Sequence, residues 1–301
     1  MAEVDLIGVP FDGYGRAGHQ AAAATVLREA GLAEVWSTHH EVASDEDLRL
    51  PPPDAARGSE TSLLNERGVL AVAHDLASAV ETSLGAGRFP MVFGGDCTVL
   101  LGIAPALLAR GGHGLMFVDG HEDTMPLDVS EDGEAANTEL GLLLGITGRT
   151  LERALCNVRG TLDARRLAVI GTRDHAWRAR FNVASLSGLG VWLTTATGTA
   201  PDPGGTGAAA VAHLRRADPR WWMHLDLDVV DPAEFAAQGL PDVADEPGGL
   251  TWGELESLVT SAVAAGGCVG VSAVIYDPDQ DPGREDARRI VQLLAAIAAA
   301  L

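Results

Sequence analysis

The sequence contains no lysine, so all 21 of its Lys and Arg residues are arginine. P-loop, Schiff-base and pyridoxal phosphate chemistry all need a lysine, and these classes of site are therefore excluded. Positive charge is scarce in general, because 42 Asp and Glu residues give a formal net charge of −21. Such a chain predicts no basic patch for nucleic acid or an anionic membrane. Its charge instead favours metal ions and a small-molecule substrate, which could itself be cationic.

Cysteine and long apolar runs are also scarce. The three cysteines (Cys97, Cys156 and Cys268) are odd in number and far apart. We therefore expect no disulfide framework and a reducing, cytoplasmic setting. The N-terminus lacks the basic and apolar segments of a signal peptide, and no unbroken apolar stretch of about 18 residues predicts a membrane span.

Short apolar runs alternate with longer helical patterns along the 301 residues, 47% of which are hydrophobic. This alternation predicts an α/β fold of three layers, in which helices cover both faces of a parallel sheet. Long loops are expected at 44–61 and 195–205, and residues 1–301 are expected to form a single domain. The expected strands are 4–9, 91–93, 114–118, 167–170, 190–194, 221–229 and 269–275; the expected helices are 21–31, 69–84, 98–109, 207–214, 251–265 and 286–301.

Polar side chains gather where the expected strand 114–118 ends. Asp119, His121 and Asp123 are two residues apart, so on extended backbone their side chains point the same way. Two carboxylates and an imidazole that converge on one point suit a divalent metal. The alternative is a solvated acidic turn.

A second polar cluster lies within the expected strand 221–229. His224, Asp226 and Asp228 alternate with apolar residues and therefore share one face. Burying like charges together is costly, and a bound cation is the simplest compensation, although an exposed edge strand would also carry this pattern. The two clusters offer enough carboxylates for two ions, which together can lower the pKa of a bridging water.

These segments resemble, in order, the motifs of the ureohydrolase family, which includes arginase and agmatinase. Gly94-Gly95-Asp96-Cys97 is similar to Gly-Gly-Asp-His, Asp119–Asp123 to Asp-Ala-His-x-Asp, and His224–Pro232 to Ser-x-Asp-x-Asp-x-x-Asp-Pro. The resemblance implies an arginase-like fold, a homo-oligomer and two divalent ions, usually Mn²⁺, that activate a hydroxide. The metal ligands that it implies are Asp119, His121, Asp123, Asp226 and Asp228, with Cys97 in place of the family's first histidine.

Several residues depart from the family pattern. A Cys97 thiolate favours Zn²⁺ or iron over Mn²⁺, or else the first metal site is weak or empty; the Cys variant resembles the branch that includes hydroxyarginine hydrolases. The alternative for Cys97 alone is an inert buried residue after a glycine turn. The family's proton-shuttling histidine has no counterpart, and Glu139 or Glu134 could replace it or be a surface acid. His224 replaces a serine and could be a ligand, an orienting residue, a proton shuttle or a structural histidine.

The family's glutamate that pairs with guanidinium is replaced by Ile275. Losing a buried, charge-assisted partner costs about 2–5 kcal/mol, so plain arginine is not the favoured substrate. Asp277 or Asp279 could substitute only if the substrate bound in another pose.

The sequence therefore predicts a metal-dependent hydrolase of linear amidine or guanidino-type C–N bonds. Asp123 is expected to orient the hydroxide and accept its proton, and His224 or Glu139 to protonate the leaving amine. The alternative is a catalytically impaired metal-binding homologue with a structural or regulatory role, although buried carboxylates without metal would destabilise its fold. A single-zinc hydrolase related to histone deacetylases fits less well, because only His39-His40 offers a histidine pair upstream.

Overall fold

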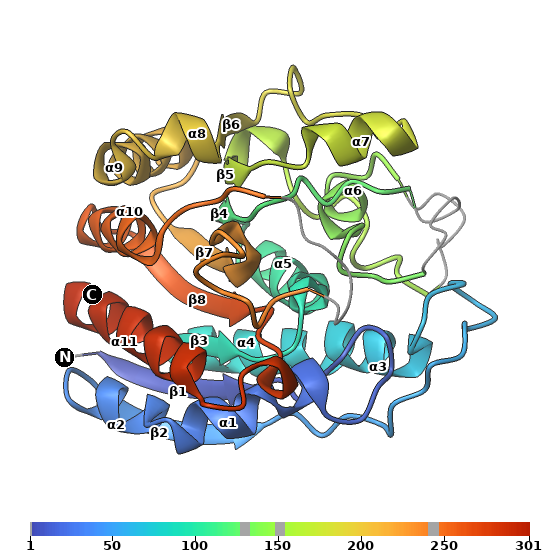
Figure 1. Ribbon diagram of the computed structural model, residues 1–301, viewed down its shortest axis with the longest axis horizontal. Helices are drawn as coiled ribbons and strands as arrows, with labels where there is room; N and C mark the ends of the chain where they lie inside the picture. Colours follow the sequence, from blue (N-terminus) through green and yellow to red (C-terminus); the bar gives the residue numbers. More distant parts are fainter. Residues whose placement is uncertain (1, 127–132, 148–153, 240–246) are drawn as a thin grey trace.

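The computed structural model describes residues 2–126, 133–147, 154–239 and 247–301. Its centre is a sheet of eight parallel strands in the order β2-β1-β3-β8-β7-β4-β5-β6 (Figure 1). The strands are β1 (Glu3–Gly8), β2 (Glu41–Asp47), β3 (Phe89–Phe93), β4 (Gly114–Val118), β5 (Leu167–Thr172), β6 (Trp192–Thr195), β7 (Trp221–Asp226) and β8 (Cys268–Val274).

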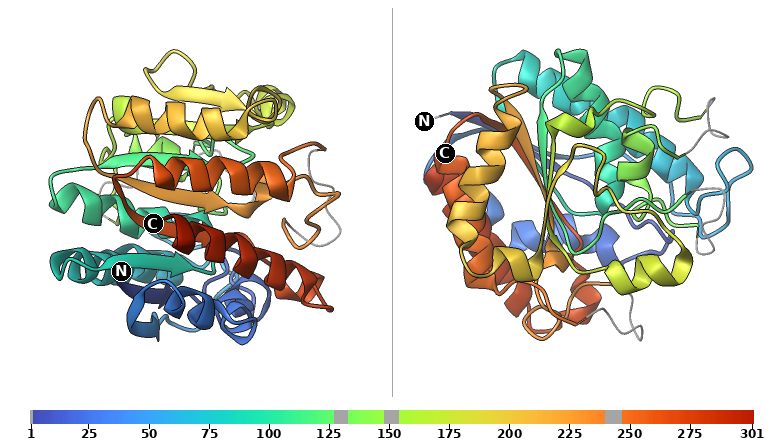
Figure 2. Two further views of the ribbon diagram at one scale, coloured as in Figure 1. Left: turned by 90° about the vertical axis from the view of Figure 1, so that its left-hand side faces the viewer. Right: turned by 90° about the horizontal axis from the view of Figure 1, so that it is seen from above.

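Helices cover both faces of this sheet (Figure 2). One layer contains α1, α2, α9, α10 and α11, and the other contains α3, α4, α5 and α6 (Figure 1). In the described ranges, no helix is long and apolar enough to cross a membrane. The helices are α1 (Ala23–Glu29), α2 (Leu32–Ser37), α3 (Glu66–Ala71), α4 (Ala77–Gly85), α5 (Leu100–Ala109), α6 (Glu139–Leu143), α7 (His175–Phe181), α8 (Ala196–Thr199), α9 (Pro203–Leu214), α10 (Trp252–Ala264) and α11 (Glu285–Ala300).

Strand β7 shows why the sheet has two cores. Trp221, Met223 and Leu225 are buried on the face covered by α9, α10 and α11, whereas Trp222 is buried on the opposite face. The whole strand is buried, as expected for a central strand of a parallel sheet. His224 follows the same alternation as Trp222 and therefore points to the same side.

The order of the strands determines which loops meet. Parallel strands have their carboxyl ends at one edge of the sheet, where ligands bind in open α/β folds. Strands β3, β8, β7 and β4 are consecutive neighbours. The residues that follow them, although far apart in sequence, therefore converge at the middle of that edge.

The predicted three-layer α/β/α fold is confirmed, with local corrections. The predicted loop 44–61 begins inside β2, an exposed acidic strand. Among the described residues β2 is the edge strand next to β1, and it therefore lacks an apolar pattern. The predicted loop 195–205 contains α8 and the start of α9, where Asp202 caps a helix that begins with a proline. The predicted strand 221–229 ends at Asp226. The strands of this one sheet come from segments between Glu3 and Val274. That residues 1–301 form a single domain remains a prediction.

Candidate metal centre

An acidic cluster occupies the carboxyl edge of the sheet. It combines the residues that follow β3, β4 and β7 with the first residue of α6. Five carboxylates, one thiol and one imidazole lie together, and all except His121 and Asp228 are buried. The members of the acidic cluster are Cys97, Asp119, His121, Asp123, Glu139, Asp226 and Asp228.

The possible ligand atoms form overlapping groups, in each of which all atoms lie within 4.8 Å of one another. The first group is Cys97, Asp119 and Asp226. The second is Cys97, Asp123 and Glu139, and the third is Asp119, His121 and Asp123. Asp228 joins through His121, whose Nδ1 is 2.8 Å from Asp228 Oδ2. Because the groups share members, they fit two neighbouring ions better than separate sites.

The loop after β4 turns sharply to bring its ligands together. Asp119 Oδ1 accepts a hydrogen bond from the backbone N–H of His121 at 2.6 Å. The backbone N–H of Gly120 donates to Asp228 Oδ1 at 2.9 Å, which ties this loop to the end of β7. A side chain at Gly120 would place Cβ 2.1 Å from Arg173 Nη1 and 2.9 Å from Asp228 Oδ1. A larger residue at this position would therefore have to displace the guanidinium of Arg173.

The end of β7 is shaped by its own aspartate. Asp226 Oδ1 accepts from the backbone N–H of Asp228 at 2.7 Å and so caps the single turn η7 (Leu227–Val229). The other oxygen, Asp226 Oδ2, lies 2.8 Å from Cys97 Sγ. Cys97 is also 3.9 Å from Asp119 Oδ2 and begins the turn η3 (Cys97–Val99) after β3. The sulfur thus lies between the aspartates of two other strands.

A chain of hydrogen bonds leads from the core to this sulfur. Trp222 Nε1 donates to Ser272 Oγ at 3.0 Å, and Ser272 Oγ lies 2.8 Å from His224 Nδ1. The indole can only donate, so the serine hydroxyl is free to donate to Nδ1. When the serine donates to Nδ1, the ring hydrogen sits on His224 Nε2, which faces Cys97 Sγ at 3.3 Å. Burial lowers the pKa of His224 to about 3, so the imidazole is neutral at physiological pH.

A buried network of ion pairs supports the loop after β4 on the side that faces away from the acidic cluster. Glu122, between two candidate ligands, points away from the acidic cluster and pairs with Arg178 Nη2 at 2.7 Å. It also accepts from Ser185 Oγ and from the backbone N–H of Leu186. Arg178 Nε is 3.0 Å from Asp174 Oδ1, and Asp174 Oδ2 accepts from the backbone N–H of Glu122 at 3.0 Å. These bonds hold the loop in the conformation in which His121 and Asp123 face the acidic cluster.

The electrostatics of the acidic cluster fit divalent cations. Burial, followed by repulsion from neighbouring carboxylates, raises the pKa values of Asp119, Asp123 and Asp226 well above the ordinary range. Asp228 differs, because the charges of His121 and Arg173 outweigh its burial and hold its pKa low. Bound cations would reverse the first effect by favouring the ionised forms. The donor set of carboxylates, imidazole and thiol is one that Mn²⁺, Fe²⁺ or Zn²⁺ accepts.

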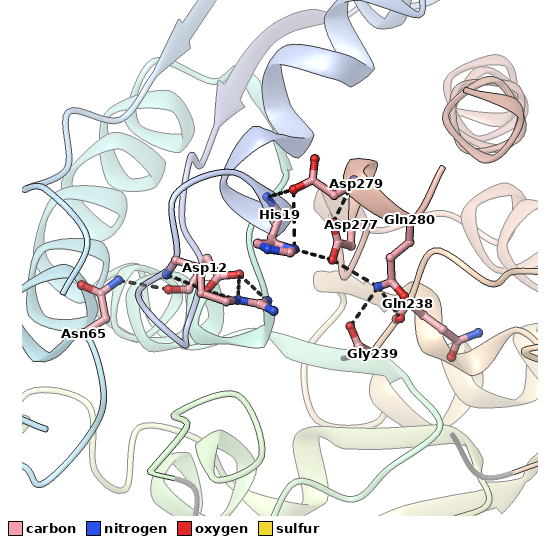
Figure 3. Close-up of polar contacts among 9 residues, drawn as sticks. Asp12, His19, Asn65, Gln238, Gly239, Asp277, Asp279 and Gln280 are labelled. Atoms are coloured by element: carbon pink, nitrogen blue, oxygen red, sulfur yellow. Dashed lines mark hydrogen bonds and ion pairs between the residues drawn. The ribbon is translucent and has the colours of Figure 1, made fainter. Parts of the chain in front are cut away.

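The rim of this edge joins the N-terminal loop to the loop after β8 (Figure 3). His19 Nδ1 is 2.9 Å from Asp277 Oδ2, and the backbone N–H of His19 donates to Asp279 Oδ2 at 3.1 Å. Asp277 also accepts from Gln280 Nε2 at 3.1 Å. Through these contacts, the carboxylate of Asp277 joins the two loops. Ile275, between this rim and the β8 strand, is nearly buried and has a φ of 63°, which is strained for a β-branched residue.

The structure brings together the expected ligands Cys97, Asp119, His121, Asp123, Asp226 and Asp228 with Glu139, and it places His224 against Cys97. Glu134, the other acid that the sequence offered, lies near Gly13 instead. The patterns did not identify Ser272, Arg173, Arg178 or the outward-facing Glu122. Arg173 directly follows β5 at the carboxyl edge of the sheet, and this position is a signal that could have identified it. Nothing local marks Ser272, which meets His224 only because β7 pairs with β8 in that register.

Comparison with known proteins finds a matching family and several relatives. A model described as the Arginase family matches residues 2–300. The arginase of Eremothecium gossypii is 27% identical over 218 residues, which are 68% of this chain and 51% of that protein. The chain therefore aligns with about half the length of that relative.

Solved structures share the fold over almost the whole chain. The arginase of Bacillus caldovelox has a TM-score of 0.85 and 23% identity, covering 99% of this chain and 98% of that one. The proclavaminate amidino hydrolase of Streptomyces clavuligerus has a TM-score of 0.69 and 21% identity, covering 100% of this chain and 92% of that one. At these identities the likeness shows the fold alone.

Proposed function

This chain belongs to the arginase family, and on that basis we propose that it is a metal-dependent hydrolase of linear amidine or guanidino-type C–N bonds. Proteins of this family are hydrolases that act on C–N bonds of small molecules and typically use two metal ions. The observation that carries the proposal is the acidic cluster, in which five carboxylates meet a thiol and an imidazole at the carboxyl edge of the sheet.

The metal set is part of the proposal. The ligands are Cys97, Asp119, His121, Asp123, Asp226 and Asp228, and the ions are two Mn²⁺ or, because a thiolate is a soft ligand, Zn²⁺. Bound together, two such ions would lower the pKa of a water between them to near neutrality and supply a hydroxide. The residues of the chain would then orient that nucleophile and move its proton.

We assign the proton transfer to Asp123. Its carboxylate belongs to two of the overlapping groups and would therefore be close to either ion. It can accept the proton of the nucleophile as the new C–O bond forms. When the C–N bond breaks, the leaving amine needs a proton, which Asp123 can return.

His224 is better suited to positioning than to proton transfer. A neutral imidazole that uses Nδ1 toward Ser272 and Nε2 toward Cys97 carries no acidic imidazolium proton for a leaving amine. We propose that it orients the sulfur of Cys97 and directs an N–H toward it. This is the role that hydrogen-bonded residues behind a metal ligand commonly take.

The substrate class follows from the residue at position 275. Ile275 presents a nearly buried alkyl side chain where a guanidinium-binding carboxylate would stand by family resemblance. An amidino, N-hydroxyguanidino or related group therefore fits better than the guanidinium of plain arginine. A homo-oligomer in the cytoplasm belongs to the same proposal, and light scattering of the purified protein tests the assembly.

A catalytically impaired metal-binding homologue is the second candidate. Two observations favour it: Ile275 replaces the expected carboxylate, and Glu139 rather than a histidine lies beside Asp123. The complete set of aspartates argues for retained metal binding in either case. Turnover separates the two candidates.

The test measures metal and turnover on the same preparations. Protein purified without chelator is analysed by plasma mass spectrometry as wild type, as Asp228→Ala and as a surface control, Asp163→Ala. We expect about two ions per chain in the wild type and control, fewer in Asp228→Ala, and release of amine or urea from an amidino or hydroxyguanidino compound. Bound metal without turnover of any such compound would favour the impaired homologue. Absence of metal even after reconstitution would overturn the hydrolase.

A further inference from the structure

We propose that Glu139 is a direct ligand of the ion that Cys97 binds, and not a proton carrier. This inference rests on the proposed two-metal site and deepens it, because it changes the donor set of one ion. Glu139 is the first residue of the short helix α6, and its neighbours Leu140, Leu142 and Leu143 are buried with it.

The first argument is that the carboxylate of Glu139 lacks a partner. The residue has 0% exposure, so water does not solvate it. Neither Oε1 nor Oε2 has a hydrogen-bond partner among the described residues. A buried, unsatisfied carboxylate is costly unless a positive charge or a donor meets it. The protein therefore leaves both oxygens available for something that it binds.

The second argument is the identity of the nearest polar groups. Ligand atoms of Glu139, Asp123 and Cys97 all lie within 4.8 Å of one another. An ion that binds oxygen at about 2.0–2.2 Å and sulfur at about 2.3 Å joins donors roughly 3–4 Å apart. Small adjustments of these side chains would bring all three into contact with one ion.

The third argument is charge. Two carboxylates that face each other need either a shared proton or a cation between them. The nearest cationic side chain of the acidic cluster, His121, already pairs with Asp228 at 2.8 Å. A thiolate beside the two carboxylates adds further negative charge. A divalent cation offsets two of these three negative charges, whereas one proton neutralises a single carboxylate.

The two ions would then have unlike ligands. The ion at Cys97 would be held by sulfur and carboxylates, including Glu139. The other would be held by His121, Asp228 and the shared aspartates. Thiolate-rich sites favour Zn²⁺ or iron, so the two ions should differ in affinity and in spectrum. This difference allows the role of Glu139 to be tested without turnover.

The experiment titrates the metal-free full-length protein with Co²⁺ alone. Binding is followed by calorimetry and by the near-ultraviolet charge-transfer band that a Co²⁺–thiolate bond produces. The variants are Glu139→Gln, which keeps the shape but removes the charge, and Asp228→Ala, which removes a ligand of the other ion. Glu134→Gln, in the same segment but outside the ligand groups, is the matched control.

We expect two Co²⁺ per chain in the wild type and in Glu134→Gln. Glu139→Gln should weaken the step that produces the thiolate band by more than the 10–100-fold typical of residues behind a ligand. Asp228→Ala should weaken the other step and leave the band in place. If Glu139→Gln retains both Co²⁺ affinities and the thiolate band, Glu139 shares a proton with Asp123. The inference about Glu139 is then wrong, while the proposed two-metal function stands. If the wild type binds no Co²⁺, the proposed two-metal function fails with it.

Discussion

Replacing Arg178 with methionine tests whether the buried ion network holds the metal-binding loop. The side chain of Arg178 is 10% exposed and pairs with Glu122 at 2.7 Å and Asp174 at 3.0 Å, each 1% exposed. Methionine fills much of the same volume without the charge, so two buried carboxylates lose their cation. Breaking a buried pair in this way typically costs about 3–5 kcal/mol.

The lower end of that range fits this site. Glu122 keeps its hydrogen bonds from Ser185 and Leu186 after the substitution. We therefore expect a loss of about 3 kcal/mol in the free energy of unfolding, measured by urea denaturation at pH 7. Metal affinity should fall about 10–100-fold, because Glu122 stands between two ligands.

A control and the pH dependence sharpen this test. Arg165 makes a pair of similar length with Asp163, at 2.8 Å, but it is 80% exposed, so Arg165→Met should change nothing measurable. Burial already raises the pKa of Glu122 in the wild type. Without Arg178 that pKa rises further above its unfolded value, so the neutral form supports the fold at low pH and this support is lost as pH rises. The difference between variant and wild type should therefore widen from pH 5 to pH 7. If Arg178→Met is as stable as the Arg165 control, the network does not hold the loop.

Three further substitutions probe separate features. Burial raises the pKa of Asp96 from 3.8 to about 6, so its neutral form stabilises the fold at low pH. Up to about 3 kcal/mol of the free energy of unfolding is lost as pH rises through 6. Asp96→Asn should remove this dependence in denaturation curves from pH 4 to 7, and an unchanged pH profile would contradict the expectation. Ser272→Ala should shift the Co²⁺–thiolate band and weaken binding about tenfold by releasing the His224 tautomer that faces Cys97, whereas an unmoved band would show that the chain does not reach the sulfur. Ile275→Glu should raise kcat/KM for guanidinium compounds by about tenfold or more, and no gain would mean that another group excludes them.

Much of the fold and of the candidate site is encoded locally. The alternation of apolar strands with helices predicted the parallel α/β sheet, because each strand of such a sheet is buried on both faces. The spacing of Asp119, His121 and Asp123 predicted one shared site, and their ligand atoms do lie within 4.8 Å of one another. A sharp turn after β4, with a φ of 42° at Asp123, brings them together, and not the extended backbone that the prediction assumed. Asp226 and Asp228 were expected to share one face of an extended strand, but β7 ends at Asp226 and Asp228 lies in the turn η7. Local pattern failed where burial was partial, as at the exposed edge strand β2.

Only the tertiary structure decided which groups meet across strands. The sequence offered Glu134 and Glu139 equally, but the fold places Glu139 beside Cys97 and Asp123 and leaves Glu134 near Gly13. Similarly, the neutral ring of His224 faces the sulfur of Cys97 because Ser272 holds its other side. Ser272 lies in β8, 48 residues further along the chain, and its Oγ is 2.8 Å from His224 Nδ1. Local spacing determines the face on which a side chain lies. Strand order and register determine its partners, and they depend on long-range packing that no short segment of sequence contains.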